Sequence, residues 1–328
     1  MKAIVCTEYG SPDVLQLKEV NRPIPKDDEA LVKIYAASLN AADFETLRGV
    51  FVVRITAPRK PMYKILGSDF AGKIEVVGEK VKQFNIGDEI WGDLSFPLGY
   101  STFAEYVCVP EHALRLKPSI MTFEEAAAVP TAGVVALQNL VVKRPVKPGQ
   151  KVLINGAGGG VGTFAVQIAK FYGAEVTGVD SAGKLDMLRS IGADHIIDYT
   201  KEDFTQSEGH YDLILDVVAS RSIFEYKRAL SPGGFFIYVG GSTKAIFQAL
   251  LVGPLISRTG SHQMGIGKWA PNDKEDLDTL QELIEAGHVT PVIDRQFTLN
   301  ELGDAMRYLE DGHAQGKVVI TVARNNNT

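Results

Sequence analysis

The sequence is poor in cysteine and lacks the patterns that would organise a metal or disulfide framework. It has 328 residues and only two cysteines, Cys6 and Cys108, and neither a CxxC nor an HExxH pattern occurs. Two isolated cysteines cannot staple a small secreted fold, and a cysteine-rich zinc lobe needs closely spaced thiolates. We therefore expect no structural zinc and no export to an oxidising compartment.

The chain also lacks an excess of positive charge and any long unbroken apolar run. Lys and Arg number 34 against 40 Asp and Glu, for a net charge of −6, so a basic surface that would bind a phosphate backbone is not expected. The most apolar stretches, 126–142 and 245–257, contain proline and polar residues and fall short of the ~20 apolar residues of a membrane span. Glu8 interrupts the apolar start of the sequence before a signal-peptide core can form. These features predict a cytoplasmic enzyme with neither nucleic acid nor a membrane as its partner.

The first third of the chain is typical of a compact β-rich domain. Short apolar strands alternate with glycine, proline and aspartate turns. The expected strands are KAIVC (2–6), ALVKIYAAS (30–38), GKIEVVGE (72–79), DEIWGD (88–93) and FAEYVCV (103–109). After them, Thr122 and Glu125 have the spacing of a capping box, so we expect a helix to begin there and to lead into a second domain.

From about residue 150 the pattern changes to alternating strands and helices. Near-continuous apolar strands separated by helical segments indicate a parallel sheet that is buried on both faces. The sequence thus predicts an α/β protein with a doubly wound parallel sheet of the Rossmann type over 121–262, and a β-rich domain formed by 1–120 and 263–328. The expected strands of the parallel sheet are KVLING (151–156), AEVTGVD (174–180), HIIDY (195–199), YDLILDVV (211–218) and GGFFIYVGG (233–241).

A glycine cluster at 156–162 follows the first of these strands and opens an apolar helix. It fits the GxGxxG pattern of dinucleotide-binding turns with alanine, Ala157, at the first position and glycine at the other two. Backbone without side chains lets a pyrophosphate approach the helix N-terminus, whose partial positive charge favours an anion. We therefore expect the backbone of Gly159, Gly160 and Val161 to bind the pyrophosphate of a dinucleotide.

The end of the second Rossmann strand carries conflicting signals about which dinucleotide binds. Asp180 is suited to accept hydrogen bonds from the adenosine ribose of NAD and would repel a 2′-phosphate. Ser181, Lys184 and Tyr199 could instead donate hydrogen bonds to that phosphate. We favour NADPH as the cofactor and keep NADH as the alternative.

Motifs along essentially the whole chain resemble those of the medium-chain dehydrogenase/reductase superfamily, and within it the zinc-independent quinone oxidoreductase branch. The motifs are AASLNAAD, GSDFAGKIEVVGEKVKQFNIGDEIWG, FAEYVCVP, AAAVPTAGVVALQ and VLINGAGGGVGTFAVQIAK. The resemblance implies that the β-rich domain is a GroES-like catalytic domain. It also places the nicotinamide in a cleft between the domains, near Asn40 and Thr131, with Gly240 and Gly241 offering backbone groups to the carboxamide. We expect a homodimer.

The resemblance also bears on metal chemistry. Zinc dehydrogenases of the superfamily hold their catalytic metal with two cysteines and a histidine, at positions that correspond here to Asn40, Ser68 and Thr131. An amide and two hydroxyls do not replace thiolate and imidazole around zinc. We therefore expect no metal in the reaction.

Without a metal, the expected reaction is delivery of hydride from the cofactor to quinones or α,β-unsaturated carbonyl compounds, whose conjugation spreads the charge that forms. Asn40 is the candidate hydrogen-bond donor to the substrate, or else a structural amide of its loop. Asp43 is expected to order that loop, and Thr131 is the second candidate catalytic residue. The candidate substrate-pocket walls are the aromatic residues Phe51, Tyr63, Phe96 and Tyr100.

Two other functions are compatible with a glycine-rich turn. One is a dinucleotide-binding redox sensor or structural protein without efficient turnover, which would keep the glycine loop and lack a competent pocket. The other is a methyltransferase, whose strand–turn–helix looks alike. A methyltransferase does not account for the N-terminal β domain.

Overall fold

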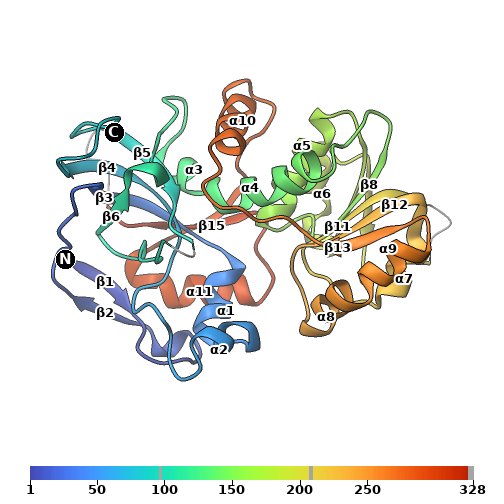
Figure 1. Cartoon of the computed structure of the whole chain (residues 1–328), viewed down its shortest axis with the longest axis horizontal. Helices are drawn as coiled ribbons and strands as arrows, with labels where there is room; N and C mark the ends of the chain where they lie inside the picture. Colours follow the sequence, from blue (N-terminus) through green and yellow to red (C-terminus); the bar gives the residue numbers. More distant parts are fainter. Residues whose placement is uncertain (96–97, 207–209, 324–328) are drawn as a thin grey trace. The chain divides into compact units, whose positions relative to one another are not determined.

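The computed structural model describes residues 1–95, 98–206 and 210–323 (Figure 1). It divides into two compact units. The first unit consists of Met1–Thr131, Pro271–Leu277 and the C-terminal segment from Ile293. The second unit consists of Ala132–Ala270 and Asp278–Val292.

The first unit is built on a mainly antiparallel sheet with the strand order β14-β15-β3-β4-β5-β7, in which β6 also pairs with β3. Strands β14 and β15 are parallel to each other, and a separate hairpin is formed by β1 and β2. The strands are β1 (Lys2–Val5), β2 (Gln16–Glu19), β3 (Glu29–Leu39), β4 (Asp69–Val77), β5 (Glu89–Asp93), β6 (Tyr106–Pro110), β7 (Arg115–Leu116), β14 (Ile293–Thr298) and β15 (Lys317–Thr321).

Strand β3 is the centre of this sheet, because β4, β6 and β15 all pair with it. Its side chains are buried at most positions on both faces, so two hydrophobic clusters form around it, one near Ile34 and Phe70 and one near Leu39 and Ile320. Burial on both faces explains why the strand reads as a nearly continuous apolar run. The helices of the first unit are α1 (Ala41–Arg48), α2 (Phe51–Thr56), α3 (Phe123–Ala127) and α11 (Leu302–Glu310).

The second unit contains a sheet of six parallel strands in the order β10-β9-β8-β11-β12-β13. Numbered along the chain, this is the 3-2-1-4-5-6 order of the Rossmann fold. The doubly wound parallel sheet predicted from the sequence is thus confirmed. The strands are β8 (Lys151–Asn155), β9 (Glu175–Asp180), β10 (His195–Asp198), β11 (Tyr211–Asp216), β12 (Leu230–Tyr238) and β13 (Gln263–Ile266).

The helices of the second unit pack against this sheet: α5 contacts β8 and β9, α6 contacts β9 and β10, and α8 and α9 contact β13. Their bounds are α5 (Gly160–Phe171), α6 (Leu185–Ser190), α7 (Ile223–Ala229), α8 (Thr243–Leu251) and α9 (Gly253–Thr259). Helices α4 (Pro130–Leu137) and α10 (Lys274–Glu285) each contribute residues to both units.

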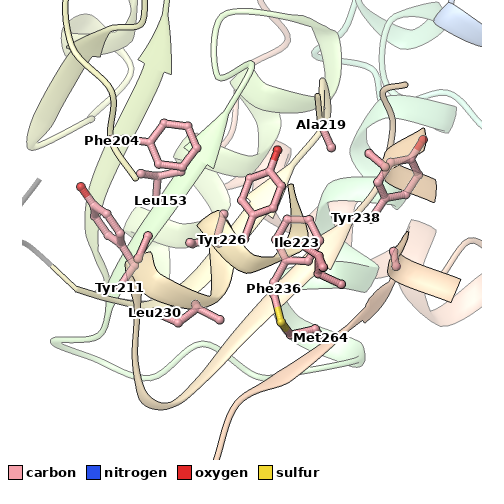
Figure 2. Close-up of a cluster of buried hydrophobic side chains, with 14 of the residues drawn as sticks. Leu153, Phe204, Tyr211, Ala219, Ile223, Tyr226, Leu230, Phe236, Tyr238 and Met264 are labelled. Atoms are coloured by element: carbon pink, nitrogen blue, oxygen red, sulfur yellow. The ribbon is translucent and has the colours of Figure 1, made fainter. Parts of the chain in front are cut away.

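A cluster of aromatic side chains fills the core between α7 and the sheet (Figure 2). The ring of Tyr226 stacks on that of Phe236, with their centroids 4.2 Å apart. The ring of Phe204 also lies near that of Tyr226, at a centroid distance of 6.3 Å. Burying a tyrosine requires a partner for its hydroxyl. The Tyr226 hydroxyl accepts a hydrogen bond from the backbone N–H of Arg221, so this ring is placed by a polar contact as well as by packing.

The capping box expected at Thr122 and Glu125 is confirmed at the start of α3. The units divide at other residues than the sequence predicted. Residues 121–131 belong to the first unit because α3 packs against β3 and β4. Residues 263–270 belong to the second unit, because β13 extends the parallel sheet by pairing with β12.

Within the part of the chain that the structure describes, no helix combines the length and apolarity needed to cross a membrane. The expected homodimer stays a prediction.

Candidate functional site

The first unit contains a buried polar network centred on the carboxylate of Asp69. Asp69 begins β4, is fully buried, and pairs across the sheet with Ser38 of β3. Its Oδ2 accepts hydrogen bonds from Ser38 Oγ and Asn40 Nδ2, both at 2.9 Å. Its Oδ1 accepts from the Thr131 backbone N–H at 3.1 Å and from the Thr131 hydroxyl at 2.6 Å. One carboxylate therefore joins β3, β4 and the start of α4.

Asn40 lies in this network at the point where β3 ends and α1 begins. It is the N-cap residue of α1, and its backbone N–H donates to Asp43 Oδ2 at 2.8 Å. Asparagine is among the residues preferred at this position. Asp43 therefore orders the turn that presents the Asn40 amide.

A lysine completes the network from the other end of the chain. Lys317 begins β15, is 2% exposed, and its Nζ donates to Asn40 Oδ1 at 2.6 Å and to Leu39 O at 3.0 Å. The same ammonium lies 3.4 Å from Asp69 Oδ2. The network thus contains a buried ion pair whose other hydrogen bonds go to neutral side chains and to backbone groups.

Burial shifts the titration of the groups around this ion pair. It raises the pKa of Asp43 and that of Asp93 to about 7, and the negative charge of Asp69 adds to both effects. Burial also lowers the pKa of Lys317, against the opposing effect of Asp69 and Asp43. Desolvation disfavours the charged form of each group, which accounts for the opposite directions for acid and base.

The two candidate catalytic residues from the sequence, Asn40 and Thr131, both bind the Asp69 carboxylate, so the fold brings them together. Ser68 joins them, with its Oγ 3.5 Å from Thr131 Oγ1. The sequence analysis missed Asp69 and Lys317. The available signal was a charged residue at the start of a strand, directly before a short apolar run, in DFAG and in KVVI.

Two of the candidate pocket aromatics lie close together in the described part of the chain. The rings of Tyr63 and Tyr100 lie near each other, with centroids 5.4 Å apart. Tyr100 has a backbone φ of 59°, and the next residue, Ser101, has a φ of 98°. Phe51 lies on α2 with 60% of its surface exposed. Phe96 lies outside the described residues.

In the second unit, the glycine loop leads from β8 directly into α5. Gly156 has a φ of +78°, a conformation that favours glycine, and a Cβ on Gly162 would lie 2.2 Å from Gly156 O. A Cβ on Gly159 would meet only Gly156 O, at 3.5 Å. Backbone conformation and packing therefore explain the glycines at 156 and 162, whereas the described residues leave open space beside the backbone of Gly159.

Gly159 caps α5, and Gly160 and Val161 form its first turn, where backbone N–H groups have no acceptor within the helix. All three residues are partly exposed. An open backbone surface at the N-terminus of a twelve-residue helix fits the pyrophosphate of a nicotinamide dinucleotide.

Asp180, at the end of β9, holds this loop in place. Its Oδ2 accepts from the Gly158 N–H and its Oδ1 from the Ser181 N–H, both at 2.8 Å. Lys184 Nζ lies 3.4 Å from Asp180 Oδ1, and both side chains are largely buried. The sequence suggested opposite roles for Asp180 and Lys184, but in the structure they form one ion pair. Tyr199 lies at the next strand end with 53% of its surface exposed.

Gly240 and Gly241 follow β12 at the same edge of the sheet as Asp180. Gly240 O accepts from the Ala219 N–H at 2.8 Å, and a Cβ on Gly241 would lie 2.2 Å from Ala219 O. The close approach of two backbone segments therefore requires glycine at 241, independently of any ligand.

Two family models match the chain. The model described as "Alcohol dehydrogenase GroES-like domain" matches residues 26–119, and the model described as "Zinc-binding dehydrogenase" matches residues 191–320. The first matched segment lies in the first unit, and the second begins in the Rossmann unit and extends into β15.

Curated relatives match over nearly the whole chain. The chain is 37% identical to a 2-methylene-furan-3-one reductase from Solanum lycopersicum, over 98% of its own length and 79% of that protein. It is 34% identical to the NADPH-dependent alkenal/one oxidoreductase of Arabidopsis thaliana chloroplasts, with the same coverage. Among solved structures, the quinone oxidoreductase from Coxiella burnetii has a TM-score of 0.89 at 33% identity, covering 98% of this chain and 99% of that one.

The geometry of the glycine loop generates a prediction. Gly159→Val should leave the protein folded, because the added side chain meets no protein atom closer than 3.5 Å at its Cβ, yet it should abolish binding of NADPH and NADH by filling the space beside the helix N-terminus. Fluorescence titration with each dinucleotide measures the affinity, and thermal melting reports the fold. Gly265→Ala, in β13, is the control, because its Cβ position is also open. Unchanged affinity in Gly159→Val would show that the pyrophosphate binds elsewhere.

Proposed function

Because the chain belongs to the quinone oxidoreductase-like branch of the medium-chain dehydrogenase/reductase superfamily, we propose that it reduces quinones and α,β-unsaturated carbonyl compounds with NADPH and without a metal. The observation that carries the proposal is the convergence of Asn40 and Thr131 on Asp69. By the resemblance, these neutral residues stand at positions where zinc dehydrogenases of the superfamily hold their metal. The names of these relatives agree with the proposal, since an alkenal, an enone and a quinone are all conjugated carbonyl compounds.

The donor set does not fit zinc, although one matching family model carries zinc in its description. Asn40, Ser68 and Thr131 offer an amide and two hydroxyls, whereas zinc sites in proteins use thiolate, imidazole and carboxylate ligands. Asp69, the carboxylate that both Asn40 and Thr131 contact through their side chains, already accepts hydrogen bonds at both oxygens. We therefore derive no step of the reaction through a metal.

When bound, the nicotinamide cofactor supplies the hydride. Negative charge then develops on the carbonyl oxygen of the substrate, and the protein accelerates the reaction by placing a hydrogen-bond donor against that oxygen. We assign this role to Asn40 Nδ2, which has two hydrogens, only one of which is directed at Asp69 Oδ2. Thr131 is assigned a supporting role, because its hydroxyl hydrogen is donated to Asp69 and only its oxygen lone pairs face other groups.

The preference for NADPH rests on the ion pair at the end of β9. A free carboxylate there would repel a 2′-phosphate, but Lys184 and two backbone N–H groups surround Asp180. The lysine compensates the charge of Asp180 and offers further donors to a phosphate. A relative that is 34% identical is named as NADPH-dependent, which agrees with this choice.

The proposed activity is tested by following NADPH oxidation with a panel of benzoquinones and enones. Cyclohexenone should be reduced and cyclohexanone should not, because only the first is conjugated. Incubation with a strong chelator should leave the rate unchanged, and elemental analysis should find less than one zinc per chain. A protein that binds NADPH tightly but reduces no member of the panel would be the redox sensor or structural protein considered as the alternative. Loss of activity together with stoichiometric zinc would contradict the metal-free reaction.

The role of Asn40 is tested by Asn40→Ala. Removing one hydrogen-bond donor to a developing oxyanion costs about 2.7–4 kcal/mol, so we expect kcat to fall about a hundredfold or more. The dissociation constant for NADPH should stay within about twofold, since the interaction forms mainly in the transition state. Asn85→Ala, which changes an exposed asparagine of the same unit, is the matched control. Full activity in Asn40→Ala, or loss of activity only through unfolding, would make Asn40 a structural amide and move the test to Tyr63 and Tyr100.

The cofactor preference is tested by Lys184→Met. This change removes a donor and leaves the charge of Asp180 uncompensated, so NADPH should bind about 10- to 100-fold more weakly while NADH changes little. Lys201→Met is the control, because Lys201 pairs with Asp198 at the end of the neighbouring strand and its loss removes the same charge. Equal weakening of both cofactors by Lys184→Met would exclude contact with the 2′-phosphate. Substitution of Asp180 is less informative, because it also releases the amides of Gly158 and Ser181.

A further inference from the structure

Lys317 is a fully buried lysine that the proposed chemistry does not yet use. Its Nζ is surrounded by Leu39 O, Asn40 Oδ1 and Asp69 Oδ2 at 3.0, 2.6 and 3.4 Å. Burying an ammonium is costly unless it is paired and hydrogen-bonded. Each of its three hydrogens has an acceptor, so the site is built around this one group.

The chemistry of lysine fixes the orientation of the Asn40 side chain. An ammonium can only donate hydrogen bonds, so the amide atom that faces Lys317 must be the carbonyl oxygen. The amide nitrogen then lies against Asp69 Oδ2 at 2.9 Å. With the two groups exchanged, the amide nitrogen would face the ammonium and the amide oxygen would face the carboxylate, and both contacts would be repulsive.

Among Lys317, Asp69 and Asn40, only Asn40 has surface that solvent reaches to a substantial extent. Lys317 and Asp69 are 2% and 0% exposed, whereas Asn40 is partly exposed. The buried ion pair of Lys317 and Asp69 thus binds the Asn40 amide on its buried side. A hydrogen bond from an ammonium to the carbonyl oxygen also polarises the amide and strengthens the N–H groups as donors.

We propose that Lys317 is a positioning residue for the reaction: it holds the carbonyl oxygen of Asn40 so that the free N–H of the amide is directed at the substrate oxygen. This inference rests on the proposed function, since it requires Asn40 to contact the substrate. Lys317 itself is not assigned contact with substrate or cofactor.

A purely structural role, in which Lys317 ties β15 to β3, is the competing explanation. The backbones of these strands already pair, with Val318 opposite Leu39 and three further pairs along the ladder. A structural role predicts lower stability with no specific effect on kcat. A positioning role predicts an effect on kcat that depends on Asn40.

The test is a double-mutant cycle that combines Lys317→Met with Asn40→Ala. Alone, Lys317→Met should lower kcat about tenfold, with the KM for the enone and the dissociation constant for NADPH within about twofold. In the Asn40→Ala background it should lower kcat no further. Lys317→Arg should recover part of the loss, because a guanidinium also donates to the amide oxygen.

The matched control is Lys117→Met. Lys117 lies in the same unit, its side chain is 5% exposed, and it contacts Glu89 and the carbonyls of Pro118 and Met121, none of which belongs to the Asp69 network. This variant should keep the kcat of the wild type. An equal fall in kcat in both variants would assign the effect of Lys317 to general destabilisation.

A variant that fails to fold does not end the test. If Lys317→Met does not fold, the same cycle is run with Lys317→Arg, whose reduction of kcat should vanish in the Asn40→Ala background. A direct readout is the side-chain amide signal of Asn40 in protein labelled with ¹⁵N-asparagine, assigned by its loss in Asn40→Ala. This signal should move in the folded Lys317 variant and stay in place in Lys117→Met.

The outcomes distinguish failure of the positioning role of Lys317 from failure of the proposed function. Losses in kcat that multiply in the double variant, or an Asn40 signal that does not respond to Lys317, would overturn the positioning role while the proposed function stands. A wild-type protein that reduces no quinone or enone, or an Asn40→Ala variant with full activity, would instead overturn the proposed function or the role of Asn40 in it. The amide signal would still report whether Lys317 orients Asn40.

Discussion

The first unit depends on the buried carboxylate of Asp69. Four hydrogen bonds from Ser38, Asn40 and Thr131 converge on its two oxygens, and Lys317 lies beside it. These partners come from the end of β3, the start of α4 and the start of β15, which are far apart in the sequence. A buried ion pair contributes little net stability, yet removal of one partner leaves an uncompensated charge. The network therefore acts mainly to fix a single geometry for the residues around it.

The second unit also contains a buried carboxylate at the end of a strand. Asp180 accepts the N–H groups of Gly158 and Ser181 and pairs with Lys184, so a buried carboxylate at a strand end again orders the adjoining loop. A third example is Asp216, at the end of β11, which accepts from Asn155 Nδ2 and from the Val218 N–H. Burial raises the pKa of Asp216 to about 6. In each case the glycine-rich or irregular loop gains its rigidity from an acid whose own position is set by the sheet.

The sequence predicted those elements of the fold that depend on residues close together in the chain. Alternating strands and helices predicted the parallel sheet, and the glycines at 156–162 predicted a loop that enters a helix, because both signals lie within about thirty residues. The division into units was predicted less well, since the pairing of β13 with β12 decides where residues 263–270 belong. That pairing has no local signature.

The polar networks were the least predictable features. The family resemblance names Asn40 and Thr131 as candidates, but Asp69 and Lys317 are separated by 248 residues and no spacing rule connects them. At the end of β9 the sequence names Asp180 and Lys184 as candidates but does not predict that they pair with each other. Asp180 and Lys184 were interpreted as competing ligands for two cofactors, whereas the fold pairs them with each other. Pairing of buried charges is decided by tertiary contacts, which a one-dimensional pattern does not contain.

The proposed substrate class follows from the kind of donor this network presents. A zinc ion provides a fixed positive charge that stabilises an alkoxide, and this charge helps most with saturated alcohols and ketones, in which the developing negative charge stays on one oxygen. In a quinone or an enone the charge is spread over a conjugated system, so a neutral amide N–H held in the correct direction is a sufficient partner. The positive charge of Lys317 is buried and donates to the carbonyl oxygen of the Asn40 amide. The network therefore favours acceptors that carry their negative charge in delocalised form.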